Sequence, residues 1–188
     1  MADAGIDALA AEVENQCHFA LFSIRLAEGH LAYLDYCMGG PEVPPGTVVS
    51  PPPGVPPQTT QFWAGAQGLL AATACLSKLF WPGGEAEREQ RKPLRERFQV
   101  PESWADSPIG NRDVRNSFEH IDREIVKLAG ENPGANVMDL SLSNRPGQPP
   151  GVALLRYFDG GQGVIRFAAH EFHVPSVRAE VERLLTLV

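Results

Sequence analysis

The chain has 188 residues, of which 43% are hydrophobic, and its formal net charge at pH 7 is −7. This length suits one domain, and the apolar fraction is sufficient for a real core. The acidic charge argues against a protein that coats nucleic acid by bulk electrostatics, although an enzyme can still engage RNA at one local patch.

The cysteines and the first residues favour a cytoplasmic protein. Cys17, Cys37 and Cys75 are an odd number of cysteines, with no spacing typical of a metal or redox site. Cys17 and Cys75 lie in apolar helical patterns, so we expect both to be buried free thiols in a reducing compartment. No charged and then apolar leader follows Met1, and no apolar run approaches the length of a membrane span.

The first third of the chain predicts a long helix followed by a proline-rich loop. The apolar positions of residues 5–36 recur at spacings of three and four, which is the pattern of one helix face. Residues 39–41, Gly-Gly-Pro, would end this helix. Residues 41–57 are too rich in proline for a helix or a central strand, and we expect a surface loop that folding does not need.

Two further helices are predicted before the middle of the chain ends. Residues 61–80 show a wide apolar face, and residues 59–60, both threonine, can cap this helix. Residues 85–98 form a charged helix with a break or restart at Pro93. Acidic residues alternate with its basic ones, which favours a solvated helix face over an RNA-binding patch. The candidate basic patch comprises Arg88, Arg91, Lys92, Arg95 and Arg97, together with Arg112, Arg115 and Arg123.

After Pro133 the apolar period changes from that of a helix to that of a strand. Strands are predicted at residues 137–142, 152–158 and 164–172. The sequence D-G-G-Q-G between the last two is typical of a hairpin turn. A last helix, residues 177–187, would be capped by Ser176. The predicted fold class is therefore mainly α (α+β): an antiparallel bundle of about four helices with a small C-terminal antiparallel sheet and a terminal helix.

Residues 112–128 carry the clearest chemical pattern. They predict one amphipathic helix whose apolar stripe leaves a polar cluster on the opposite face. In this helix Arg115 and Asn116 are followed by His120, which gives R-N-x-x-x-H. This pattern resembles the signature of the HEPN family of small helical ribonucleases and nucleotide-binding proteins. The longer string R-N-S-F-E-H-I-D-R-E is similar to a group of bacterial HEPN-type proteins, and the resemblance covers residues 5–130.

The resemblance implies that residues 5–130 are an HEPN-like helical bundle. Together with the β-β-β-α extension that the sequence pattern predicts for residues 134–188, this gives an expected single HEPN-like domain over residues 1–188. HEPN ribonucleases, toxin-like members included, cut RNA without a metal ion or other cofactor. They generally act as dimers in which two copies of the motif face each other. The partners implied are therefore a second copy of the chain and RNA or a nucleotide, but neither DNA nor a membrane.

The same resemblance assigns roles to the side chains of the motif. His120 would act as acid or base when the ribose 2′-hydroxyl attacks the adjacent phosphate. Arg115 would stabilise the charge that develops on the phosphate, and Asn116 would orient the imidazole or the phosphate. The supporting residues are Glu119, Arg112 and Arg123. Glu119 could fix the tautomer of the imidazole or pair with a neighbouring arginine.

Other interpretations of the same residues stay open. Arg115, Glu119 and Arg123 are four apart, which is also common on ordinary solvated helix faces. The main alternative is a non-catalytic HEPN-like module that binds a nucleotide or a partner protein or only dimerises, and the acidic charge favours it. A third is an interaction protein that acts through its proline-rich loop. His170 and His173 lack the spacing of a zinc protease, so no metal site is expected.

Overall fold

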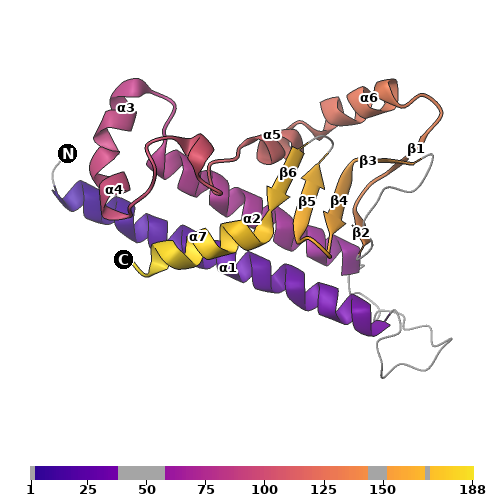
Figure 1. Ribbon diagram of the computed structural model, residues 1–188, viewed down its shortest axis with the longest axis horizontal. Helices are drawn as coiled ribbons and strands as arrows, with labels where there is room; N and C mark the ends of the chain where they lie inside the picture. Colours follow the sequence, from indigo (N-terminus) through magenta and orange to yellow (C-terminus); the bar gives the residue numbers. More distant parts are fainter. Residues whose placement is uncertain (1–2, 38–57, 144–151, 168–169) are drawn as a thin grey trace.

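The computed structural model describes residues 3–37, 58–143, 152–167 and 170–188, and these form a mainly helical fold with a small sheet (Figure 1). The mainly helical class and the small sheet followed by a terminal helix are confirmed. The predicted proline-rich loop lies outside the described residues.

Two long helices, α1 (Asp3–Cys37) and α2 (Gln58–Phe80), run in opposite directions and pack side by side (Figure 1). Both helices were predicted, and their bounds differ from the predicted ones by a few residues. Glycine allows the two backbones to approach closely, since a Cβ atom on Gly65 would lie 2.9 Å from the carbonyl oxygen of Ser23. The side chains that α1 buries again recur at three and four: Val13, Cys17, Ala20 and Ile24.

The predicted charged helix is two short helices, α3 (Glu85–Gln90) and α4 (Lys92–Arg97), with Pro93 in the first turn of α4. The predicted break is therefore confirmed. Arg95 on α4 is only 3% exposed and does not belong to a solvated patch. Its Nη1 donates to the carbonyl oxygen of Phe80, 2.8 Å away at the end of α2. A cation at the C-terminus of a helix stabilises the partial negative charge there.

The single helix predicted for residues 112–128 is wrong, because the chain bends at His120. A short 3₁₀ turn, η1 (Trp104–Asp106), precedes two helices, α5 (Asp113–Glu119) and α6 (Ile121–Glu131). The backbone angles of His120 are φ −118° and ψ 38°, outside the helical range. The apolar spacing continues through the bend, which is why periodicity alone does not reveal it.

The described strands form two sheets and are more numerous than the sequence predicts. The strands are β1 (Asn136–Met138), β2 (Ser141–Ser143), β3 (Val152–Leu154), β4 (Arg156–Asp159), β5 (Val164–Phe167) and β6 (His170–His173). Strands β4, β5 and β6 are antiparallel as predicted, whereas β2 pairs in parallel with β4, and β1 with β3. The first predicted strand is interrupted at Leu140, which takes a left-handed conformation with φ +55°.

The stretch predicted as one strand over residues 164–172 is a hairpin of β5 and β6. Arg166 lies opposite Glu171 in this pair, and their side chains form an ion pair of 3.0 Å. Both halves are strand-like in sequence, with mostly buried side chains in β5 and a single buried one, Phe172, in β6, so together they imitate one strand. No Gly, Pro, Asn or Asp lies between them to indicate a turn.

The last helix, α7 (Val174–Leu185), begins earlier than predicted and has a different cap. His173, and not Ser176, is the capping residue, and its Nδ1 accepts a hydrogen bond of 3.3 Å from the backbone N–H of Ser176. The helix runs along α1 (Figure 1). It buries Val177, Val181 and Leu184.

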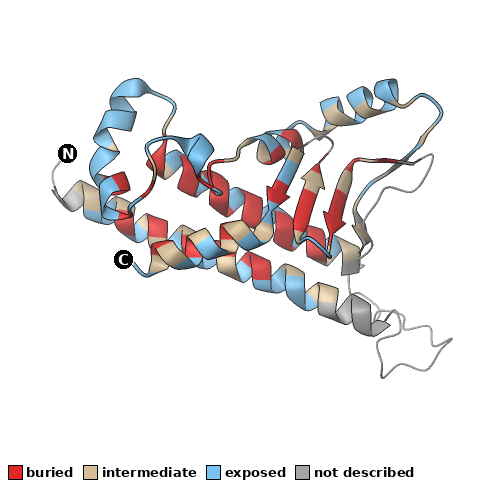
Figure 2. Ribbon diagram, viewed as in Figure 1, coloured by how far each residue is buried: buried red, intermediate tan, exposed pale blue. Residues whose placement is uncertain are grey.

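The buried side chains of the helices and the sheet form one contiguous core (Figure 2). Phe158 on β4 packs on Phe62 of α2 with ring centroids 4.7 Å apart, so the C-terminal part shares its core with the helices. Cys17 is buried as predicted, but Cys75 is exposed. Cys75 faces solvent because it lies on the outer stripe of α2: Ala64, Gln67, Ala71, Cys75 and Lys78. None of the described helices is long and apolar enough to cross a membrane.

Candidate functional site

The bend between α5 and α6 brings the motif to the surface. Val114 is buried, and Phe118 packs on Phe167 of the sheet with ring centroids 4.7 Å apart, which fixes α5 in place. Asn116 and His120 are exposed, and Arg115 is partly buried. Asn116 and His120 therefore face away from the core, whereas Arg115 lies on the flank of the helix.

The backbone around His120 joins the two short helices. The N–H of His120 donates to the carbonyl oxygen of Asn116 at 3.0 Å and closes the last turn of α5. The carbonyl oxygen of His120 accepts from the N–H of Arg123 at 3.0 Å and opens α6. The imidazole thus projects from a fixed backbone point between two helix ends.

Glu119 pairs with Arg115. Its Oε1 accepts from both Nε and Nη2 of Arg115, at 3.0 and 2.8 Å. Of the two roles predicted for Glu119, this contact corresponds to pairing with an arginine. The carboxylate orients the guanidinium on the surface of α5, and a pair of this kind contributes about 0.3–0.5 kcal/mol to stability.

Arg112 does not belong to the exposed polar cluster, and its predicted place there is wrong. Its Nε donates to Ser77 Oγ at 2.9 Å and its Nη2 to the carbonyl oxygen of Trp81 at 2.5 Å. Burial lowers the pKa of Arg112, and the positive charges of Arg115 and Arg88 lower it further. Arg112 therefore joins the start of α5 to the end of α2, because the carbonyl groups there need donors.

The other arginines of the predicted basic patch lie on different helices. Arg123 is exposed on α6, one turn after His120. Arg97 forms an ion pair of 2.9 Å with Asp7 of α1. With Arg95 buried against the end of α2, the predicted basic patch does not form one surface. The positive charges of Arg88 and Arg115 nevertheless act on Arg112.

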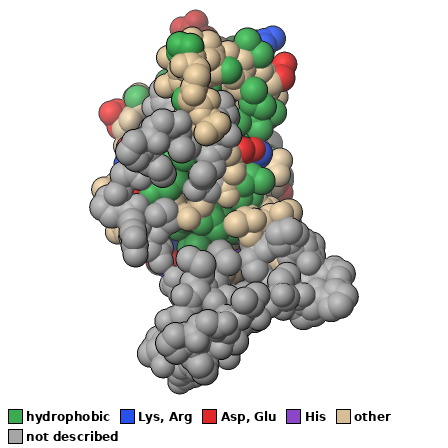
Figure 3. Space-filling model, turned by 90° about the vertical axis from the view of Figure 1, so that its right-hand side faces the viewer, with side chains coloured by type: hydrophobic (Ala, Val, Ile, Leu, Met, Phe, Trp, Pro, Cys, Tyr) green, Lys and Arg blue, Asp and Glu red, His purple; other side chains and the backbone are tan. Residues whose placement is uncertain are grey.

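Exposed apolar side chains lie beside the motif on α6. Ile125 is 43% exposed and Val126 is 74% exposed, and no residue of α6 is fully buried. Figure 3 shows hydrophobic side chains at the top of one face of the molecule, where α6 lies. We call Ile125 and Val126 the α6 apolar pair. Because large exposed apolar side chains in a group often mark an interface, the pair is a candidate contact surface next to the motif.

A second apolar surface lies on α1, on the opposite side of the molecule from α5 and α6 (Figure 1). Phe19, Phe22 and Leu26 are 60%, 65% and 37% exposed. We call these residues the α1 apolar stripe. These positions lie outside the apolar face of α1 that the sequence predicts, although their spacing of three and four is itself a signal of an apolar stripe.

Comparison of the chain with protein-family models, curated proteins and solved structures finds no match. The resemblance to HEPN proteins therefore rests on the residues of the motif and on their helical setting. In the part of the chain that the structure describes, no three His, Cys, Asp or Glu residues are grouped so that they could hold a metal ion.

Proposed function

We propose that this protein is an HEPN-like, metal-independent endoribonuclease that acts as a homodimer in the cytoplasm. The observation that carries the proposal is the exposed imidazole of His120, which projects from the junction of α5 and α6, while Glu119 orients the guanidinium of Arg115 on α5. The domain organisation over residues 1–188 and the bundle of about four helices expected for HEPN proteins belong to the same proposal.

The proposed reaction needs only side chains of this surface. His120 of one subunit accepts the proton of the ribose 2′-hydroxyl, whose oxygen attacks the adjacent phosphorus atom. The bond from phosphorus to the 5′-oxygen breaks, and a protonated imidazole, that of the second copy of His120, gives its proton to this oxygen. The products are a 2′,3′-cyclic phosphate and a 5′-hydroxyl. Arg115 stabilises the charge on the phosphate oxygens, and Asn116 orients them.

A donor of Arg115 supports binding of a phosphate in spite of the acidic chain. Arg88 and Arg115 each lie within electrostatic range of Arg112. Glu119 contacts Nε and Nη2 of Arg115, and in the described part of the chain no hydrogen bond is recorded for Nη1. That atom can donate to a phosphate without loss of the existing pair.

The proposal requires a dimer in which the α6 apolar pairs of the two chains contact each other. This pair lies on the helix that begins directly after His120, so contact there brings two copies of the motif to one interface. A dimer through the α1 apolar stripe would leave the two motifs on outer faces, because α2 lies between α1 and α5 (Figure 1).

The proposal is tested by incubating single-stranded RNA with the protein and a chelator of divalent ions. We expect cleavage that leaves a 2′,3′-cyclic phosphate. His120→Ala should abolish it and leave the fold intact, since this exposed side chain fills no core. Arg115→Ala should lower the rate by a factor of about 10².

The matched control for these variants is Lys127→Ala, which removes an exposed side chain of α6 outside the motif and should cleave at the normal rate. Activity that survives His120→Ala, or that requires a divalent ion, would exclude this mechanism.

The second candidate function is a non-catalytic HEPN-like module that binds a nucleotide or a partner protein. The observation that favours it is the Glu119 carboxylate, which already holds two donors of the Arg115 guanidinium and adds negative charge where a phosphate would lie. Binding of a nucleotide with a dimer but without cleavage of any RNA would support this candidate over the ribonuclease.

A further inference from the structure

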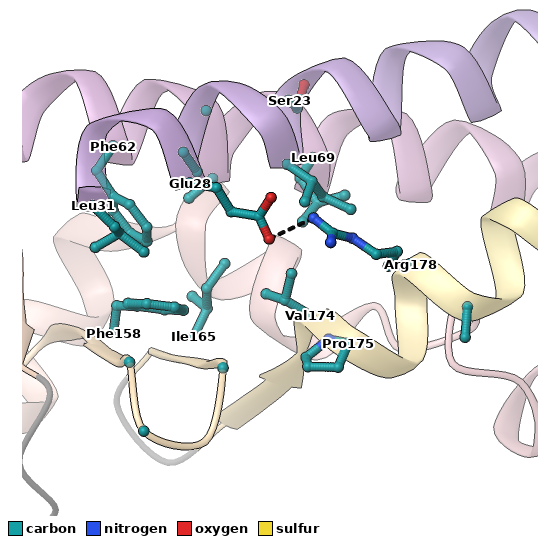
Figure 4. A pocket seen from close by; sticks show the side chains of 18 of the residues that line it. Ser23, Glu28, Leu31, Phe62, Leu69, Phe158, Ile165, Val174, Pro175 and Arg178 are labelled. Carbon is teal, nitrogen blue, oxygen red and sulfur yellow. Dashed lines mark hydrogen bonds and ion pairs between the residues drawn. The ribbon is translucent and has the colours of Figure 1, made fainter. Parts of the chain in front are cut away.

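A cavity of about 540 Å³ lies on the side of the molecule where α1, α2 and α7 meet the turn between β4 and β5 (Figure 4). Leu31, Phe62, Phe158 and Ile165 form its apolar end. This volume is in the range of cavities that bind small molecules, and a predominantly apolar lining with few polar groups is typical of such sites. The motif on α5 does not contribute to it.

The β4–β5 turn and the start of α7 form one part of the cavity wall. Gly163 in the turn has a φ of +67°, and a Cβ atom there would lie 3.0 Å from the ring of Pro175 at the start of α7. The turn therefore lies directly against α7 and closes one end of the cavity. A side chain larger than that of glycine at position 163 would therefore push the turn away from α7.

Three charged side chains lie at the cavity: Glu28 from α1, and Arg178 and Glu182 from α7. Glu28 and Arg178 point toward each other (Figure 4), and Arg178 Nη2 donates to Glu28 Oε1 at 2.5 Å. Glu182 lies one turn further along α7 and forms no ion pair with any residue that the structure describes. The charge of the lining is therefore −1, from two carboxylates and one guanidinium.

We propose that this cavity binds a small molecule with an aromatic or aliphatic body and a single protonated amine. The apolar body would replace water against Phe62, Phe158 and Ile165, which yields hydrophobic free energy. The ammonium group would remain at the mouth, where the net negative charge attracts it and the carboxylates accept its hydrogen bonds. A ligand carboxylate would instead meet that negative charge. This inference is independent of the proposed ribonuclease activity.

The test compares three probes that differ only in their charged end: 4-phenylbutylamine, 4-phenylbutanol and 4-phenylbutyrate. Isothermal titration calorimetry of the full chain near neutral pH and at low salt should give one saturable site for the amine. We expect the amine to bind about tenfold more tightly than the alcohol, and the carboxylate to bind most weakly. Equal binding of amine and alcohol, stronger binding of the carboxylate, or no binding of the amine at millimolar concentration would overturn the inference.

Two substitutions that change the charge of the cavity lining in opposite directions test whether the amine binds in this cavity. Glu182→Gln makes the lining neutral and should weaken amine binding about three- to tenfold. Arg178→Gln leaves both carboxylates unbalanced and should strengthen amine binding by a similar factor. Glu131→Gln removes the same charge from α6, away from the cavity, and should change nothing. If Glu131→Gln and Glu182→Gln weaken amine binding equally, the binding depends only on the net charge of the protein. This result would also overturn the inference.

Discussion

Glu119 orients the guanidinium of Arg115 in the absence of a ligand. Its Oε1 accepts from two donors of the guanidinium, so the carboxylate both orients the cation and repels a phosphate. Glu119→Gln keeps an acceptor oxygen and removes the charge. We predict that this variant lowers KM for RNA about three- to tenfold while kcat does not rise, because it improves binding and adds nothing to the chemical step.

The control for this prediction is Glu131→Gln, which removes an exposed carboxylate at the far end of α6. If both variants lower KM equally, the effect is one of overall charge. If Glu119→Gln leaves KM unchanged, Arg115 does not bind the phosphate, and its pair with Glu119 is an ordinary surface contact.

Cys17 makes the stability of the fold depend on alkaline pH. Burial and, to a smaller extent, the negative charges of Glu180 and Glu14 together raise the pKa of the thiol from 9.0 to about 12. Above pH 9 the unfolded chain therefore loses a proton that the folded chain keeps, so the free energy of unfolding falls as pH rises from 9 toward 12. The contribution is on the order of 1 kcal/mol per pH unit.

We predict that urea unfolding at pH 8 and pH 10 distinguishes the buried Cys17 from the exposed Cys75. Cys17→Ala should lower stability at pH 8, because it opens a small cavity, and should reduce the loss on going to pH 10. Cys75→Ala, at an exposed position of α2, should show the same loss as the original chain. An identical loss in Cys17→Ala would show that this thiol does not cause the pH dependence.

At the scale of elements, two apolar surfaces compete as the interface of the proposed dimer. The α6 apolar pair lies beside the motif and the α1 apolar stripe lies on the opposite side. We predict that Val126→Lys produces a monomer in light scattering, because it places a charge in the interface that the proposed site needs. Phe22→Lys should leave the dimer intact. The reverse result would show that the chains associate through α1 and that the motifs do not meet.

The elements that the sequence predicts well are those whose local pattern is long and whose ends carry strong signals. The helices α1 and α2 repeat their apolar spacing over many turns, and the break between α3 and α4 is marked by Pro93. The bend at His120 has no such signal, since the spacing of Val114, Phe118 and Ile121 is that of an unbroken helix. The hairpin of β5 and β6 is hidden for the same reason, because it lacks turn residues.

At the scale of the whole molecule, the roles of the arginines depend on contacts between segments distant in sequence. Arg95 and Arg112 both donate to carbonyl groups at the end of α2, which lies 15 to 35 positions earlier in the chain. From sequence alone they are indistinguishable from Arg115, which stays at the surface. The cavity between α1, α7 and the β4–β5 turn is likewise built from both ends of the chain, and no local pattern indicates it.

The central claim is that two chains form one catalytic site through the R-N-x-x-x-H motif. Its most direct test measures molar mass by light scattering and RNA cleavage in the same samples, in the presence of a chelator, over a series of dilutions. We predict that activity per chain falls in parallel with the fraction of dimer, and that Val126→Lys is both monomeric and inactive. Constant activity per chain down to concentrations where only monomer remains would contradict the account.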